Sequence, residues 1–226
     1  MLKDLYSFLI HPRINELPTA LNFNQSVLLV TRMLLFYFGT AIVTMALFHP
    51  ILKSLDLLPE RSLILSKIPI SFKLIFFVPV FEEIIFRLSL KFSKYNLFLS
   101  LATLFFILFY HTYSLIVLSV ISFVIALIPN LGMIPEIFYS RLELIWTKYF
   151  PFIFYSLAIS FGFAHLSNFV NLRMAHYLVF PLIVSNQIIM GLIFGYVRVT
   201  FKNGFIYSVM LHFLINLPLI WLTHLG

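Results

Sequence analysis

The chain has no cysteine, and only 10% of its 226 residues are charged. The absence of cysteine excludes disulfide bonds and thiolate metal ligands. A soluble globular domain carries roughly 25% charged residues, so this composition argues against a protein folded in water alone. The sequence also lacks a His-Glu-x-x-His motif, which excludes the metalloprotease helix that presents two histidines one turn apart.

The chain is rich in apolar residues instead: hydrophobic side chains are 62% of it, and the mean hydropathy is +1.03. The net charge of +7 comes from 15 basic and 8 acidic residues. The basic residues are scattered among the connections between apolar segments, where anionic lipid head groups are expected, and they form no basic stripe. The composition therefore predicts a membrane protein with no nucleic-acid partner.

The apolar runs predict an all-α fold, a polytopic transmembrane helical bundle of about seven spans (about six to eight), and the length has room for at most about eight or nine. The expected spans are residues 27–48, 70–91, 96–111, 113–134, 150–167, 176–197 and 204–224. The first is expected to end at His49-Pro50, because proline cannot donate its backbone hydrogen bond inside a helix.

Two segments are expected to lie at the membrane surface. Residues 1–26 have one short apolar run and no small-residue cleavage site, which favours an N-terminal interfacial segment over a removed signal peptide. Residues 27–226 then form the transmembrane helical domain, in which Glu136–Lys148 is a second interfacial stretch. The distribution of Lys and Arg favours a cytoplasmic N-terminus.

The segment Phe81–Arg87 holds three charges inside an apolar run. A charge near the bilayer centre costs roughly 2.5–3.5 kcal/mol to insert, so such residues usually face the bundle interior and mark function. Glu83 and Arg87 are four residues apart and share a helix face, so they are expected to pair. Glu82 lies a step around the helix and is the freer carboxylate, which makes it the candidate general base.

Two further polar pieces interrupt apolar spans, at Phe161–His165 and His212–Asn216. His165 is expected near the end of its span, where it can reach a polar cavity. His212 and Asn216 share one helix face and form a plausible donor pair for an oxyanion. Alternatively, Glu82, His165 and His212 could ligate a divalent metal such as zinc. The sequence leaves both ways of activating water open.

At these residues the chain resembles the CPBP family of intramembrane proteases, which includes CaaX prenyl endopeptidases and bacteriocin-immunity-type proteins. The family pattern is Glu-Glu-x-x-x-Arg, then Phe-x-x-x-His, then His-x-x-x-Asn or Asp, and it occurs in this chain in that order at 82–87, 161–165 and 212–216. Two departures are Leu88 in place of a frequent glycine after the arginine, and a long interval between Arg87 and Phe161.

The resemblance implies a membrane-embedded peptidase that cleaves a peptide or protein substrate close to the lipid surface, with prenylated CaaX tails as one substrate class. Glu82 and His165 would activate water, His212 and Asn216 would stabilise the oxyanion, and Glu83 with Arg87 would orient the site. The family is often described as metalloproteases. The resemblance also implies a multi-pass protein of a bacterial or archaeal cell membrane.

Two other functions are compatible with these residues. One is a non-catalytic bacteriocin-immunity or membrane scaffold protein of the same fold. The other is a small ion-coupled transporter, since buried carboxylates and histidines also form ion pathways, although no internal repeat pair supports it. The other histidines are predicted to be interface or packing residues: His11, His49, His111, His176 and His224. Asn186-Gln187 is predicted to form hydrogen bonds between helices, and Gly191 and Gly195 are predicted to allow close helix packing.

Overall fold

The structure is a computed structural model that describes residues 2–14, 18–61, 72–110, 112–132 and 134–224. His111, residues 70–71 and residue 133 fall outside the described residues, as do the side chains of 72–76 and 219–224. The described chain is helical almost throughout, which confirms the all-α prediction. The exception is a small antiparallel sheet in which β1 (Glu60–Arg61) pairs with β2 (Phe169–Val170).

The helices follow one another along the chain with short connections, and the short 3₁₀ turns among them are labelled η. In chain order they are α1 (Leu2–Ile10), α2 (Phe23–Ser54), α4 (Phe72–Phe86), η1 (Leu88–Leu90), α5 (Lys94–Phe109), α6 (Leu115–Leu127), η2 (Ile128–Asn130), α7 (Glu136–Lys148), α8 (Phe150–Ala164), η3 (His165–Asn168), α9 (Met174–Leu178), α10 (Phe180–Ile183), α11 (Ser185–Thr200) and α12 (Gly204–His224).

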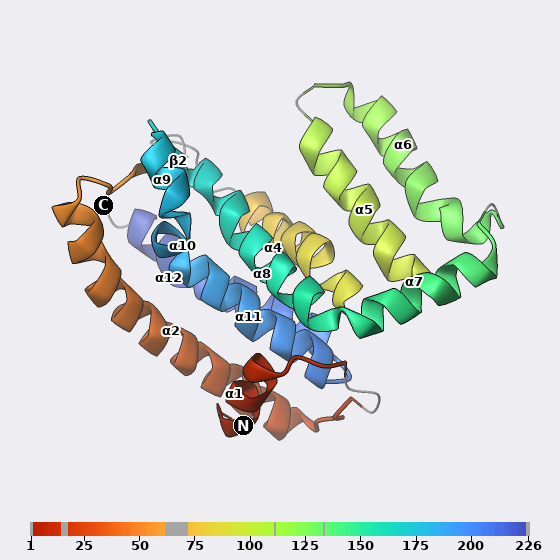
Figure 1. Ribbon diagram of the computed structural model, residues 1–226, viewed down its shortest axis with the longest axis horizontal. Coiled ribbons are helices and arrows are strands. Elements are labelled where there is room, and N and C mark those ends of the chain that lie inside the picture. The colour runs from red at the N-terminus through yellow and green to blue at the C-terminus, as the bar shows by residue number, and fades with distance from the viewer. Residues whose placement is uncertain (1, 15–17, 62–71, 111, 133, 225–226) are drawn as a thin grey trace.

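Helix α11 lies at the centre of the molecule and packs against α8, α12, α2 and α1 (Figure 1). Its inward side chains are fully buried; Ile193, Phe194 and Val197 are at most 1% exposed. Glycine allows the close contact with α8, because a Cβ on Gly191 would lie 3.1 Å from the Ala158 backbone. This confirms the predicted role of Gly191 in close helix packing.

Helices α5 and α6 form an antiparallel pair that stands to one side of this bundle, and α7 leads from it back to α8 (Figure 1). Serine side chains begin both helices: Ser93 accepts from the Asn96 amide and Ser114 from the Val117 amide. The bounds of α7 coincide with the stretch expected at the membrane surface. Ser100 of α5 ties the pair to α4 by donating to the Ile84 carbonyl at 2.7 Å.

Two sequence predictions about helix ends were wrong. Helix α2 does not stop at His49-Pro50 but runs through Pro50 to Ser54. A proline removes one hydrogen bond and disturbs one carbonyl, and the rest of the ladder can continue beyond it. Conversely, the span expected at 176–197 is divided into α9, α10 and α11. Pro181 stands in the first turn of α10, where its missing N–H costs nothing but cannot continue a preceding helix.

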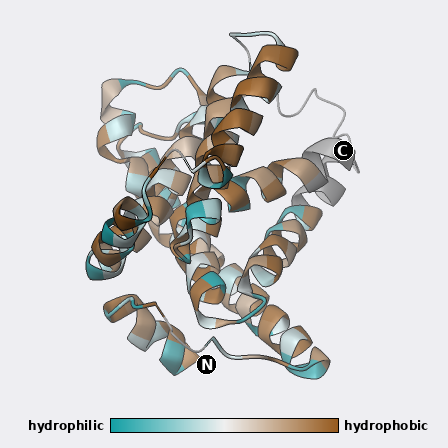
Figure 2. Cartoon of the chain, turned by 90° about the vertical axis from the view of Figure 1, so that its right-hand side faces the viewer, coloured by the Kyte–Doolittle hydropathy of each residue, from teal (hydrophilic) through white to brown (hydrophobic). Residues whose placement is uncertain are grey.

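Two described helices are long and apolar enough to cross a membrane by length and composition: α2, and the continuous segment Phe150–Asn168. Three more apolar helices are shorter, at Lys94–Phe109, Leu115–Asn130 and Gly204–Pro218. Hydrophobic residues predominate along most of the helices (Figure 2). Large apolar side chains stand exposed there, including Ile42 of α2 at 70% and Ile116 of α6 at 78%. Such a surface is suited to contact with lipid.

Candidate active site

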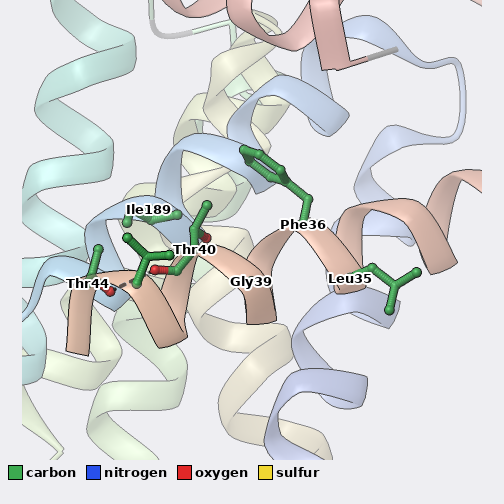
Figure 3. Close-up of a pocket in the computed structure, with 7 residues that line it drawn as sticks. Leu35, Phe36, Gly39, Thr40, Thr44 and Ile189 are labelled. Carbon is green, nitrogen blue, oxygen red and sulfur yellow. Dashed lines mark hydrogen bonds between the residues drawn. The ribbon is translucent and has the colours of Figure 1, made fainter. Parts of the chain in front are cut away.

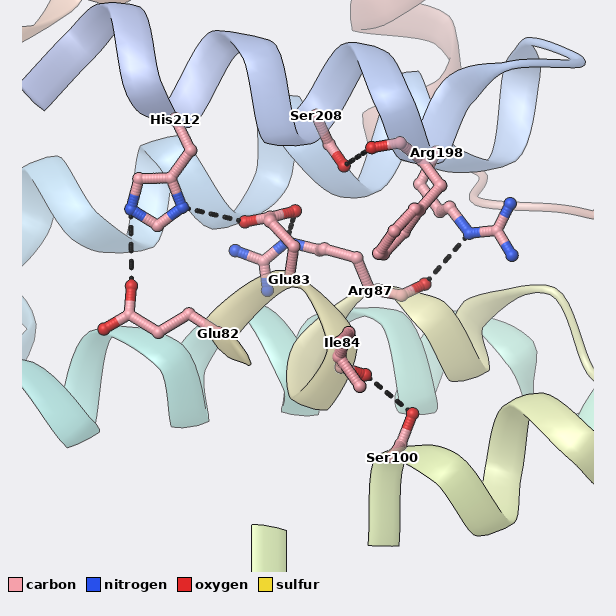
Figure 4. Close-up of polar contacts among 9 residues, drawn as sticks. Glu82, Glu83, Ile84, Arg87, Ser100, Arg198, Ser208 and His212 are labelled. Atoms are coloured by element: carbon pink, nitrogen blue, oxygen red, sulfur yellow. Dashed lines mark hydrogen bonds and ion pairs between the residues drawn. The ribbon is translucent and has the colours of Figure 1, made fainter. Parts of the chain in front are cut away.

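The three motifs come from separate parts of the chain and meet between α4, α8 and α12. Figure 4 shows the contact between the motifs of α4 and α12. Glu82 and Glu83 lie near the end of α4, His165 follows the last residue of α8, and His212 lies in the middle of α12. Helix α8 ends at Ala164 and continues as a tighter 3₁₀ turn, so His165 stands at the helix terminus, as the sequence predicted.

The imidazole of His212 lies between the two carboxylates of α4. Its Nδ1 is 3.1 Å from Oε1 of Glu83, and its Nε2 is 3.3 Å from Oε2 of Glu82. Both ring nitrogens therefore face carboxylate oxygens, which are hydrogen-bond acceptors. The His212 side chain is 2% exposed, so this contact is shielded from solvent.

Glu83 and Arg87 form the predicted pair on one face of α4, with Arg87 Nε 3.8 Å from Glu83 Oε2. The two side chains are 0% and 1% exposed. The guanidinium of Arg87 lies 4.4 Å from the centre of the Phe161 ring, a cation–π contact. Among the described residues, its Nη1 and Nη2 have no hydrogen-bond partner. The charge is therefore compensated by one carboxylate and by aromatic faces.

Glu82 and His165 form the more accessible half of the site. Their side chains are 26% and 16% exposed, and His165 Nε2 lies 4.0 Å from Glu82 Oε1. The other nitrogen, Nδ1, lies 2.8 Å from the Phe161 carbonyl, which can only accept, so Nδ1 carries a proton. In the neutral ring Nε2 is then the basic nitrogen, and it faces the Glu82 carboxylate.

Asn216 is the predicted site residue that stands apart from the others. It lies one turn beyond His212 on α12 and is half-buried. Within the described part of the chain, its carboxamide makes no hydrogen bond to the carboxylates or imidazoles. Its place on the His212 face follows from the four-residue spacing.

Sequence reasoning missed two polar residues beside the site. Ser208 is fully buried one turn before His212, where its hydroxyl donates to the Phe205 carbonyl at 2.9 Å and lies next to Glu83. Ser208 precedes His212 by four residues, just as Asn216 follows it by four, so the same spacing places Ser208 on the His212 face. Arg198 is 7% exposed in the last turn of α11. The signal in the sequence that could have indicated Arg198 is a single charged residue at the end of an apolar segment.

A metal centre is not formed by the residues that the sequence suggested for it. In the described chain, no three His, Asp or Glu side chains converge closely enough to hold one ion. The Nε2 atom of His165 lies 4.0 Å from Oε1 of Glu82, which is wide for two ligands of one zinc.

Other polar predictions have structural outcomes. Asn186 of α11 accepts from the Thr44 hydroxyl of α2, which confirms an interhelical hydrogen bond. His176 is buried, and its Nδ1 accepts from the Arg173 amide at 2.7 Å, so it caps the short helix α9.

A hollow of about 530 Å³ lies on α2, lined by Leu35, Phe36, Gly39, Thr40, Val43, Thr44 and Ile189 (Figure 3). It contains no titratable side chain and is separate from the candidate site.

The comparisons with known proteins contribute no match: no family model, no curated protein and no solved structure matches the chain. A function for the chain is therefore supported by its motifs and by the geometry of the site. The central feature of that geometry is one carboxylate, Glu82, flanked by the Nε2 atoms of His165 and His212.

Proposed function

We propose that the protein is an intramembrane endopeptidase that hydrolyses peptide bonds near the membrane surface through Glu82 and two histidines, as the resemblance to the CPBP family implies. The observation that supports this proposal best is the position of the Glu82 carboxylate between two imidazoles, backed by the buried pair Glu83–Arg87. A cluster that served only packing would not require a partly exposed carboxylate, Glu82, beside the basic nitrogen of His165.

The proposal includes a multi-pass topology with about seven spans, built from α2, α4, α5, α6, α8, α11 and α12. The exposure of large apolar side chains on six of these helices, all but the central α11, supports it. His165 follows the last residue of α8, so the candidate site would lie towards one end of that span. A scissile bond near the membrane surface could reach it there, in a protein of a bacterial or archaeal cell membrane.

The first chemical step is attack by water. A water molecule that donates hydrogen bonds to Glu82 and to Nε2 of His165 directs an oxygen lone pair at the peptide carbonyl carbon. As the C–O bond forms, the water proton passes to this carboxylate–imidazole pair, and the carbonyl π electrons move onto the carbonyl oxygen. General base catalysis of this kind contributes roughly 10²- to 10⁴-fold in rate.

The second step is collapse of the tetrahedral intermediate. The oxyanion accepts a hydrogen bond from Nε2–H of His212, assisted by the carboxamide of Asn216. The C–N bond then breaks, and the proton held by Glu82 and His165 is delivered to the leaving nitrogen. The products are a carboxylic acid and an amine, so atoms and charges balance. In this step His212 carries both ring protons: Nδ1–H donates to Glu83, which stabilises the imidazolium, and Nε2–H donates to the oxyanion.

The proposal is tested by comparing new peptide termini in membranes that contain the wild type or Glu82→Gln at matched abundance. Termini that occur only with the wild type support a protease, and their sequences identify the substrate and whether a prenylated tail is required. Asp56→Asn, a change of an exposed carboxylate, is the matched control. Identical termini with both folded proteins would favour the non-catalytic scaffold, and proton-coupled flux in proteoliposomes would favour the transporter.

A further inference from the structure

Arg198, in the last turn of α11, reaches across to the end of α4. Its Nε donates to the Arg87 carbonyl at 3.2 Å (Figure 4). Its Nη2 donates to the Leu88 carbonyl at 3.1 Å. Helix α4 ends at Phe86 and the 3₁₀ turn η1 begins at Leu88. One guanidinium therefore holds the two carbonyls at the point where the helix changes its geometry.

The partners of Arg198 are unusual for a buried cation. The side chain is 7% exposed, and within the described residues no carboxylate lies at ion-pair distance from it. A buried charge needs compensation, and in this case the carbonyl end of α4 supplies it, because the C-terminus of a helix carries partial negative charge. The rigid, planar fork of arginine can span two carbonyls at once, whereas a lysine ammonium is a single compact charge.

The held segment carries the candidate site. Arg87 provides the carbonyl that Arg198 binds, and its own side chain turns back over Phe161 towards Glu83. Glu83 in turn lies 3.1 Å from Nδ1 of His212. The position of the α4 terminus therefore sets the direction of the Arg87 side chain, and through Glu83 it sets the orientation of the imidazole.

We propose that Arg198 is a positioning residue of this site, which acts by fixing the end of α4; the kinetic part of this inference depends on the proposed peptidase function. Arg198 is too deeply buried to contact a substrate itself. Its effect is on kcat, because a displacement of about 1 Å in a reacting group can cost on the order of 100-fold in rate. Substrate binding at the exposed face is expected to change little.

The test uses Arg198→Ala with added guanidinium ion. Arg141→Ala is the matched control, since Arg141 is exposed on α7 and the same atoms are removed. Activity is measured on a quenched peptide that spans the termini found only with the wild type. We expect Arg198→Ala to lower kcat roughly 10- to 100-fold with KM within about twofold. Millimolar guanidinium should restore much of kcat, methylammonium should not, and Arg141→Ala should respond to neither.

A second readout is independent of any peptidase activity. The Leu90 amide donates to the Arg87 carbonyl at 3.2 Å, so hydrogen exchange at residues 87–91 reports on the end of α4. Arg198→Ala should accelerate this exchange, and guanidinium should slow it again. If wild type and Glu82→Gln produce the same termini, the peptidase proposal fails while this readout still tests whether Arg198 fixes α4.

Several outcomes would overturn the inference. Unchanged kcat in Arg198→Ala would do so, as would a loss of kcat without faster exchange at residues 87–91. If Arg198→Ala does not fold, Arg198→Lys decides the matter, because it keeps the charge and loses the fork. Wild-type kcat in a folded Arg198→Lys protein would show that the double contact to the carbonyls has no part in positioning the site.

Discussion

His212 of α12 places its Nε2 atom 3.3 Å from a carboxylate oxygen of Glu82 on α4. Side chains 130 positions apart in the chain therefore come within hydrogen-bonding distance, and the Glu82 carboxylate is the more accessible member of the pair, at 26% exposure. This relationship divides the site into an accessible half, Glu82 and His165, and a buried half that holds His212 in place.

Replacing Glu82 by glutamine should abolish cleavage while the protein still folds. The amide keeps the volume of the side chain but cannot take a proton from water, so we expect a loss of about 10²- to 10⁴-fold in kcat. The melting temperature in detergent should stay close to that of the wild type, because the side chain is partly exposed. Retained cleavage in the folded variant would refute the proposed base.

Replacing His165 by alanine should also remove activity by orders of magnitude, since the basic Nε2 beside Glu82 is lost. His176→Ala is a useful comparison, because His176 is a buried histidine that caps α9 and is remote from the proposed chemistry. It should lower thermal stability and leave kcat near the wild-type value. Equal losses of kcat in the two variants would mean that His165 acts only through folding.

Glu83→Ala should destabilise the protein as well as inactivate it. The change leaves Arg87 buried at 1% exposure without its carboxylate, and breaking a buried ion pair costs about 3–5 kcal/mol. Unfolding in a denaturant series measures the loss. The double variant Glu83→Gln with Arg87→Met removes both charges and should recover part of the stability; an unchanged unfolding midpoint in Glu83→Ala would contradict the assigned pairing.

Lys91, in the connection between η1 and α5, should make stability depend on pH. Burial, and then the nearby positive charge of Arg198, lower the pKa of Lys91 from 10.5 to about 8. Between these values the unfolded chain binds a proton that the folded protein has released, so stability should rise as pH increases from about 8 towards 10.5. Melting temperatures across this range should show the rise, and Lys91→Met should remove this contribution.

Single cysteines can test the proposed topology, because the natural chain contains none. The Lys202 amide bonds to the carbonyl of Thr19, close to where α2 begins, whereas Lys53 lies at the other end of that 32-residue helix. Lys202→Cys should react with an impermeant maleimide only from the cytoplasmic side, and Lys53→Cys only from the opposite side. Labelling of both from the same side would rule out α2 as a span in this orientation.

Features that depend on neighbouring residues along one helix were predictable from the sequence. The four-residue spacing of Glu83 and Arg87 determined their pairing, because one turn of helix brings them together wherever the helix packs. The high apolar content also predicted the all-α fold, because a helix satisfies the backbone hydrogen bonds of an apolar segment within that segment. The passage of α2 through Pro50 was missed, since whether a helix survives a proline depends on what packs around it.

Contacts between helices were decided only by the tertiary structure. No spacing in the sequence indicates that His212 lies between Glu82 and Glu83, or that Arg198 binds the carbonyl end of α4. These contacts depend on how closely α4, α11 and α12 approach, which is set by the packing of whole helix faces. The sequence alone therefore determined which residue types and helix faces were available for chemistry, and packing over long chain distances decided which of them meet.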